Sequence, residues 1–136
     1  MDIYSESGDI SGQIKVSIVR AETTPSNVIS TNEEFSLKVN LQIPRVPLFE
    51  KIARLRAHFC METIGVGDDY NFTTEEKNWE AEKENYEFEV FISKGTLREG
   101  VYKLSVAITT SDQANRSLPF HGFAEHEMLL QVYEPF

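Results

Sequence analysis

The sequence predicts an all-β fold, an antiparallel sandwich of two sheets with about seven strands. Three observations lead to this prediction. Apolar residues recur at every second position through most of the chain, which is the period of a strand. Turn-forming residues separate these runs at short intervals. Each run also keeps one polar face, as strands do when one side of an antiparallel sheet is buried and the other faces water.

The alternating runs give the expected strands in chain order. The clearest is 35–43, where Phe35, Leu37 and Val39 alternate with polar residues. Residues 48–54 follow as a predicted helical turn over one end of the core. We expect residues 1–12 to form a flexible arm and 13–136 to form a single sandwich domain. The remaining expected strands are 14–19, 55–62, 79–81, 86–92, 102–108 and 128–132.

Composition limits the classes of function. The chain has 136 residues and a formal net charge of −9, which argues against nucleic acid and anionic membranes as partners because both require a cationic surface. Cys60 is the only cysteine, so no intrachain disulfide forms and a reducing, cytoplasmic location is expected. No leader peptide and no membrane-spanning run is recognisable. The sequence predicts no cofactor and no metal site.

The segment from Gly100 through Tyr102 to Leu104 resembles the start of strand F in immunoglobulin-like and fibronectin type III domains. In those families a Gly-x-Tyr-x-Leu pattern carries a tyrosine corner. The resemblance implies that the Tyr102 hydroxyl bonds to upstream backbone and that the strands follow the immunoglobulin-like order. The buried tryptophan and the cysteine pair of the antibody domains are missing here. The families are mostly adhesive or scaffolding modules, so the resemblance implies no catalytic residue.

Acidic charge is concentrated in one segment. Between Asp68 and Glu89 the chain holds nine acidic and two basic residues, which places −7 of the net −9 there. A hairpin turning at 84–85 would set Glu82 opposite Glu87 and Glu80 opposite Glu89. Directly opposed like charges are unfavourable by some tenths of a kcal/mol. A basic partner or a bound cation would relieve this repulsion in an acidic ridge of these four glutamates. Alternatively, the charge keeps a sheet edge soluble.

Basic charge gathers elsewhere. Arg54, Arg56 and His58 share the predicted outer face of strand 55–62, in the sheet opposite the acidic ridge. Such a molecule could associate head to tail, with Arg54 and Arg56 of one copy against the acidic ridge of the next.

Together these features predict a non-catalytic protein-interaction or assembly module. The predicted site is the acidic ridge of Glu80, Glu82, Glu87 and Glu89, with Phe91 as an apolar anchor, and the predicted partner is the basic face of another protein. The chain is predicted not to be an enzyme.

Three alternatives remain open at this point. An enzyme would use His58 with Cys60, which we expect to lie on one strand face. Trp79 followed by the run 86–90 resembles the Trp-x-x-x-Phe-x-Phe stretch of calcium-binding C2 domains, although its spacing is several residues different, and Asp68 and Asp69 are candidate calcium ligands. A carbohydrate-binding module would need at least two exposed aromatic residues on one sheet, and the candidates are Trp79, Phe91, Tyr133 and Phe136.

Overall fold

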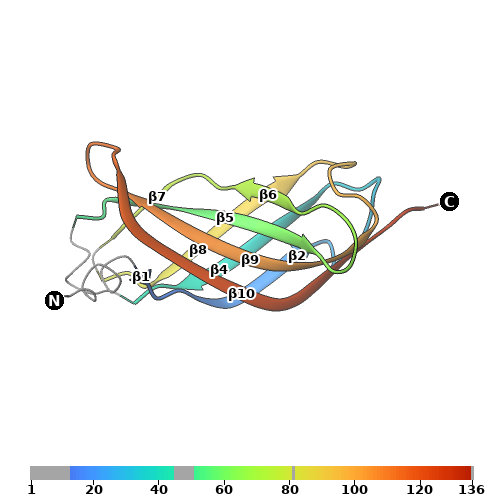
Figure 1. Ribbon diagram of the computed structural model, residues 1–136, viewed down its shortest axis with the longest axis horizontal. Helices are drawn as coiled ribbons and strands as arrows, with labels where there is room; N and C mark the ends of the chain where they lie inside the picture. Colours follow the sequence, from blue (N-terminus) through green and yellow to red (C-terminus); the bar gives the residue numbers. More distant parts are fainter. Residues whose placement is uncertain (1–12, 45–50, 81, 136) are drawn as a thin grey trace.

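The computed structural model describes residues 13–44, 51–80 and 82–135 (Figure 1). These residues form ten strands and no helix, so the all-β prediction is confirmed for this part of the chain, and no segment of it could cross a membrane as a helix. The predicted arm (1–12) and the first three residues of the predicted helical turn (48–50) lie outside the described residues. The strands are β1 (Gln13–Ile14), β2 (Ser17–Thr24), β3 (Val28–Ser30), β4 (Phe35–Gln42), β5 (Arg54–Thr63), β6 (Tyr70–Thr73), β7 (Lys77–Asn78), β8 (Asn85–Ile92), β9 (Gly100–Ser111) and β10 (Ser117–Tyr133).

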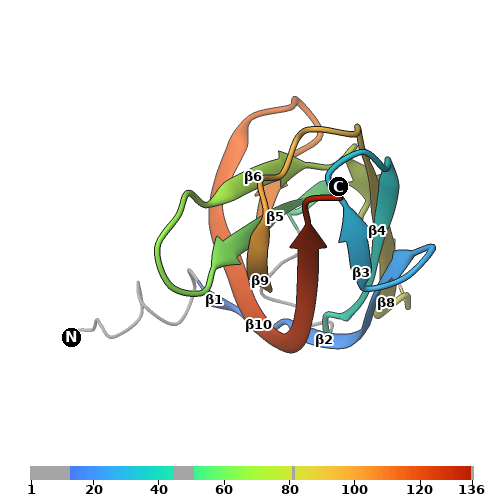
Figure 2. The same ribbon diagram turned by 90° about the vertical axis from the view of Figure 1, so that its right-hand side faces the viewer.

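The strands form a large and a small sheet that curve around one core (Figure 2). The large sheet has the order β1-β10-β9-β5-β6, with β3 also pairing with β10 and β7 with β5. The small sheet has the order β2-β4-β8. Strand β5 therefore lies in the sheet opposite β8, as the sequence predicted for the basic and acidic segments.

The finer prediction, about seven antiparallel strands, needs correction. β1 and β3 pair in parallel with β10, so the large sheet is mixed. These pairings were not predicted because β1 has two residues and β3 three, too few to show a period. The expected strand at 79–81 is also absent where it is described: β7 ends at Asn78 and pairs with β5.

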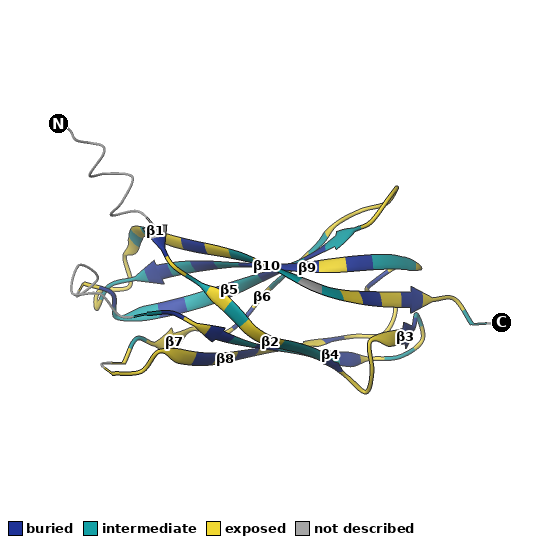
Figure 3. Ribbon diagram, turned by 90° about the horizontal axis from the view of Figure 1, so that it is seen from below, coloured by how far each residue is buried: buried dark blue, intermediate teal, exposed yellow. Residues whose placement is uncertain are grey.

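The core follows from the alternation of apolar residues. In β4, Leu37, Val39 and Leu41 are fully buried while the residues between them are partly exposed. β5 repeats the pattern with Leu55 and Phe59 on its inner face. Figure 3 shows the same alternation of buried and exposed residues along the strands of both sheets. Each sheet therefore has one dry face and one face left for solvent or a ligand.

Tyr102 connects the core to the loop before β9. Its ring is buried and lies edge-on to the ring of Tyr70, with 5.9 Å between the centroids. Its hydroxyl donates a hydrogen bond to the backbone oxygen of Arg98 at 2.5 Å. The upstream backbone contact expected for this tyrosine is therefore present.

Candidate functional site

The outer face of the large sheet carries the basic residues of β5. Arg54, Arg56 and His58 alternate with the buried inner residues of the strand. Arg56 lies opposite Thr109 of β9, and Thr109 lies opposite His121 of β10. An arginine, a threonine and a histidine thus form one row across three adjacent strands.

The next row contains an exposed aromatic side chain. His58 lies opposite Ala107, and Ala107 lies opposite Phe123, whose side chain is 61% exposed. Neighbouring strands are about 4.8 Å apart, so roughly 10 Å separates the backbones of His58 and Phe123. Because the side chain of Ala107 is short, the surface between His58 and Phe123 lies lower than these two side chains. We call Arg54, Arg56, His58, His121 and Phe123 the β5–β10 face.

His58 is held by two neighbouring hydroxyls. Its Nε2 lies 2.8 Å from Oγ1 of Thr109, and its Nδ1 lies 3.3 Å from Oγ1 of Thr73. Burial lowers the pKa of the imidazole, and the positive charge of Arg56 lowers it further. The neutral ring is therefore favoured, and its orientation is fixed by β6 on one side and β9 on the other.

The two arginines differ in how their donors are used. Arg54 donates from Nη1 to the backbone oxygen of Asp112 at 2.9 Å. Arg56 makes a long ion pair, with 3.8 Å between its Nη2 and Oε1 of Glu76, which exceeds hydrogen-bond distance. The Nε of Arg56 is buried and has no hydrogen-bond partner among the described residues. Arg56 consequently has donor capacity that the folded chain does not satisfy.

Cys60 shares the outer face of β5 with His58, as predicted, but it is not set up as a nucleophile. Burial raises the pKa of its thiol, and the carboxylates of Asp69 and Glu62 raise it further. His58 bonds to threonine hydroxyls instead of to this sulfur. The pair therefore lacks the depressed thiol pKa that thiolate chemistry requires.

The predicted acidic ridge is not formed, because the hairpin register on which it rested is wrong. β8 pairs with β4, which places Glu89 opposite Lys38 and Glu87 opposite Asn40. Nζ of Lys38 lies 3.9 Å from Oε2 of Glu87. The outer face of the small sheet thus mixes acidic and basic residues.

Glu80 and Glu82 lie in the connection that crosses from the large sheet to the small one. Oε2 of Glu80 forms an ion pair with Nζ of Lys83 at 3.2 Å. The backbone N–H of Glu80 donates to the hydroxyl of Tyr86 at 3.2 Å, and Glu82 has a φ of 67°. This turn keeps 79–84 from pairing with β8 as a straight hairpin would.

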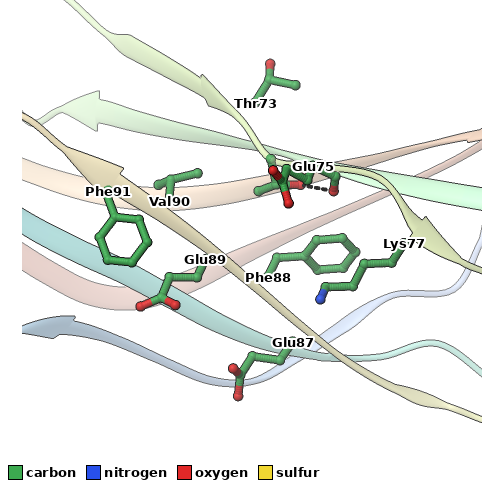
Figure 4. A pocket seen from close by; sticks show the side chains of 9 residues that line it. Thr73, Glu75, Lys77, Glu87, Phe88, Glu89, Val90 and Phe91 are labelled. Atoms are coloured by element: carbon green, nitrogen blue, oxygen red, sulfur yellow. Dashed lines mark hydrogen bonds between the residues drawn. The ribbon is translucent and has the colours of Figure 1, made fainter.

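A groove of about 540 Å³ runs along β8 beside the β6–β7 segment (Figure 4). Phe88 and Val90 lie on the side of β8 that faces Glu75 and Lys77, whereas Glu87, Glu89 and Phe91 lie on the other side. Nζ of Lys77 lies 5.7 Å from the centroid of the Phe88 ring and so covers part of the groove. The groove brings Glu87, Glu89 and Phe91 together but leaves Glu80 and Glu82 out. Its lining is Thr73, Thr74, Glu75, Lys77, Glu87, Phe88, Glu89, Val90 and Phe91.

The remaining predicted residues are scattered. Oδ1 of Asp69 accepts a hydrogen bond from the backbone of Thr63, so this carboxylate closes its own loop. The described residues contain no group of three histidine, cysteine or acidic side chains that could hold a metal ion. Trp79 is half-buried and stacked on Tyr86, with 6.2 Å between centroids. Tyr133 is exposed at the end of β10, and Phe136 lies outside the described residues.

Sequence reasoning missed the β10 half of the β5–β10 face. The predicted strand began at 128, whereas β10 begins at Ser117. Gly122 and Ala124 flank Phe123, and these small residues hide the alternation of apolar and polar positions. Gly122 is needed there because a Cβ would lie 2.3 Å from Cγ2 of Val16. A phenylalanine between two small residues is the signal that could have revealed this part of the strand.

The chain matches no family model and no curated protein. Among solved structures it is similar to the alkylpurine DNA glycosylase AlkC of Pseudomonas fluorescens, bound to DNA containing an abasic site analog, with 17% identity and a TM-score of 0.47. The likeness covers 86% of this chain and 30% of the glycosylase chain, so this chain spans less than a third of that protein. A likeness this low carries no argument about the activity of this chain.

Three predictions from the sequence nevertheless disagree with this finding, since the protein found is an enzyme whose structure contains DNA. The first is that the chain is a non-catalytic protein-interaction module, and the second is that it is not an enzyme. The third is that its partner is a basic protein or a second copy of the chain, and not nucleic acid. We do not carry these predictions further, nor the carbohydrate-binding and C2-like alternatives joined to them. The exclusion of nucleic acid had rested on the net charge of the whole chain, which ignores where the charges lie.

Proposed function

We propose that the chain is an immunoglobulin-like sandwich that binds a phosphate-bearing ligand on the β5–β10 face. Two features support the immunoglobulin-like assignment. The small sheet has the order β2-β4-β8 and faces a sheet with β10-β9-β5-β6, which agrees with the A-B-E and G-F-C-C′ strand order of that fold. The bond from Tyr102 to the backbone of Arg98 agrees with the tyrosine corner. A cytoplasmic location is part of the same proposal, supported by the lone Cys60.

The unsatisfied guanidinium of Arg56 carries the proposal. Its side chain is 41% exposed, and its contact with Glu76 at 3.8 Å is longer than a hydrogen bond, so its terminal nitrogens keep donors for an acceptor supplied from outside. Phosphate suits a guanidinium because its oxygens accept two parallel hydrogen bonds. Arg54 lies close by and adds positive charge, and His121 adds a further hydrogen-bonding group.

The net charge of −9 does not oppose binding at this face. At physiological ionic strength the charges of a protein are screened over about 8 Å. The carboxylates of β8 lie on the opposite sheet, with the core between them and Arg56. A phosphate on the β5–β10 face therefore responds mainly to the charges of that face.

The test compares two basic residues with similar exposure on opposite sheets. The side chain of Arg56 is 41% exposed and that of Lys38 is 36% exposed. Binding of a labelled oligo-dT strand and of inorganic tripolyphosphate is measured at low salt, by fluorescence anisotropy and calorimetry respectively. We expect Arg56→Gln to weaken both by roughly tenfold, the value of one charge-assisted contact. Lys38→Gln is the matched control and should leave both unchanged.

Salt dependence gives an independent measure. Each phosphate contact to a single strand contributes about −0.7 to the slope of log K against log salt. Arg56→Gln should make the slope shallower by about that amount, and Lys38→Gln should not change it. Equal behaviour of the two variants, or no binding of either probe by the unmodified chain, would overturn the proposal.

A further inference from the structure

We infer that Phe123 is a stacking platform for an unpaired base, which makes the phosphate-bearing ligand a single-stranded nucleic acid. This inference rests on the proposed function, because it assigns the second half of the same face.

The first step is the exposure of Phe123. The ring of Phe123 is 61% exposed, so covering it with another ring removes apolar surface from water, which lowers the free energy. The phenylalanines of the inner faces, Phe59 and Phe88, are fully buried and cannot offer their rings to a ligand. Phe123 projects from the outer side of β10 because its neighbours along the strand fix the parity: Gly122, on the opposite face, is buried.

The second step is the position of Phe123 relative to Arg56. The row containing His121, Thr109 and Arg56 is adjacent to the row containing Phe123, Ala107 and His58. Adjacent rows on one face are two residues apart, roughly 7 Å along the strand, and β10 and β5 are roughly 10 Å apart. The distance between a phosphate bound to Arg56 and a base stacked on Phe123 therefore corresponds to about two adjacent nucleotides of a strand.

The third step concerns the groups around the ring. Ala107 projects little above the sheet, so it leaves room for a planar group that extends from Phe123 toward β5. The hydroxyls of Thr73 and Thr109 can each make a further hydrogen bond besides the one to His58, so they can bond to the edge of a base. A plain apolar ligand would use none of these groups, whereas an unpaired base uses both its face and its edge.

Double-stranded nucleic acid fits this face poorly. In a duplex the base faces are covered by stacking, so Phe123 has nothing to cover. Recognition of duplex sequence needs an element that enters a groove, such as a helix or a β-ribbon. The β5–β10 face is the pleated outer surface of a sheet with one exposed aromatic ring and basic side chains, which matches the stacking platforms of single-strand binders.

The experiment uses the two exposed phenylalanines as a matched pair. Phe91 is 81% exposed on the outer face of the small sheet, so Phe91→Ala is the control for Phe123→Ala. Oligo-dT, the same sequence in a duplex, and tripolyphosphate are the three probes. We expect Phe123→Ala to weaken oligo-dT binding roughly tenfold, as removal of a stacking residue does, and to leave tripolyphosphate binding unchanged. Phe123→Tyr should retain oligo-dT binding.

The outcomes separate the two proposals. Loss of oligo-dT binding in Arg56→Gln with no effect of Phe123→Ala would overturn the stacking role and leave phosphate binding intact. Duplex binding as tight as single-strand binding would also overturn it. Failure of all three probes to bind the unmodified chain would remove both proposals. We expect the Phe123→Ala variant to unfold at the same temperature as the unmodified chain, because the ring lies outside the core.

Discussion

The outer faces of the two sheets contain similar residues in different surroundings. Each has a basic side chain in its middle, Arg56 or Lys38, and an exposed phenylalanine one row away, Phe123 or Phe91. Around Lys38 the neighbouring strands place carboxylates, which are Glu22 on β2 and Glu89 on β8. Around Arg56 the strands β9 and β10 place Thr109 and His121, and Glu76 makes only a long contact of 3.8 Å. The cross-strand neighbours, more than the net charge, decide which face can accept an anion.

The largest change in ligand binding is expected when the ability to bind an anion is transferred from the large sheet to the small sheet. In an Arg56→Gln background, the double change Glu87→Lys and Glu89→Lys replaces the two carboxylates on the β8 side of Lys38 with positive charge next to Phe91. Oligo-dT binding should then return, at least tenfold tighter than in the background, because counterion release grows with each added cation. Anisotropy measures the gain. No gain in a chain with an unchanged circular dichroism spectrum would show that charge and an aromatic ring are insufficient without the hydroxyls of the large sheet.

A smaller effect, on stability, is expected from removing the tyrosine hydroxyls that hydrogen-bond to the backbone beside each sheet. Tyr102→Phe removes a short bond to the backbone of Arg98 and should lower the free energy of unfolding by about 1 kcal/mol. Tyr86→Phe removes longer contacts, to Glu80 at 3.2 Å and Lys83 at 3.4 Å, and should lower it less. Urea unfolding measures both. The reverse order would mean that the turn at 80–84 stabilises the fold more than the loop before β9.

The smallest effect is expected from pH, and it should appear only on the large-sheet face. The pKa of His58 is lowered below 6.5, mainly by burial and then by Arg56. The unfolded chain therefore binds the proton more readily, so this contribution to stability is complete above about pH 6.5 and is lost as the pH falls through the folded pKa. The other titratable or charged groups near the ring are Arg56, Cys60 and His121; β6 and β9 present hydroxyls.

Urea unfolding at about pH 7.5 and about pH 5.5 tests this difference. His58→Gln should reduce the loss of stability at the lower pH, whereas Lys38→Gln, on the opposite sheet, should not. An undiminished loss in His58→Gln would assign the pH dependence to another group.

Much of the fold could be predicted because its central strands alternate cleanly. The runs 35–43 and 55–62 contain β4 and most of β5, and Arg54, Arg56 and His58 lie on the predicted outer face. This works because a strand with one buried face has a period of two whatever its partners are. The pairing partners are another matter, since period alone does not say which strand lies beside which.

The wrong predictions arose because the period of a strand does not identify its pairing partners. Glu80 and Glu82 were assigned to a hairpin with β8 because they follow the same parity, but the backbone leaves the large sheet at this point and turns through Glu82. Phe123 escaped notice because Gly122 makes room for Val16, a contact between β10 and the residues after β1 that no local pattern reveals. Both errors concern contacts between distant segments, and these decide which residues share a face.

The long strand β10 has a consequence for the order in which the chain assembles. β1 and β3 both pair with it in parallel, with Ile14 beside Gly122 and Ile29 beside Val132. Nearly the whole described chain must be synthesised before either early strand finds its partner, and closing such long loops slows folding. During synthesis, β1 and β3 would therefore remain unpaired until β10 emerges from the ribosome. A nascent chain halted before residue 117 contains the strands of the small sheet but lacks β10, so the first strands and the edge of β9 are exposed to association with other chains.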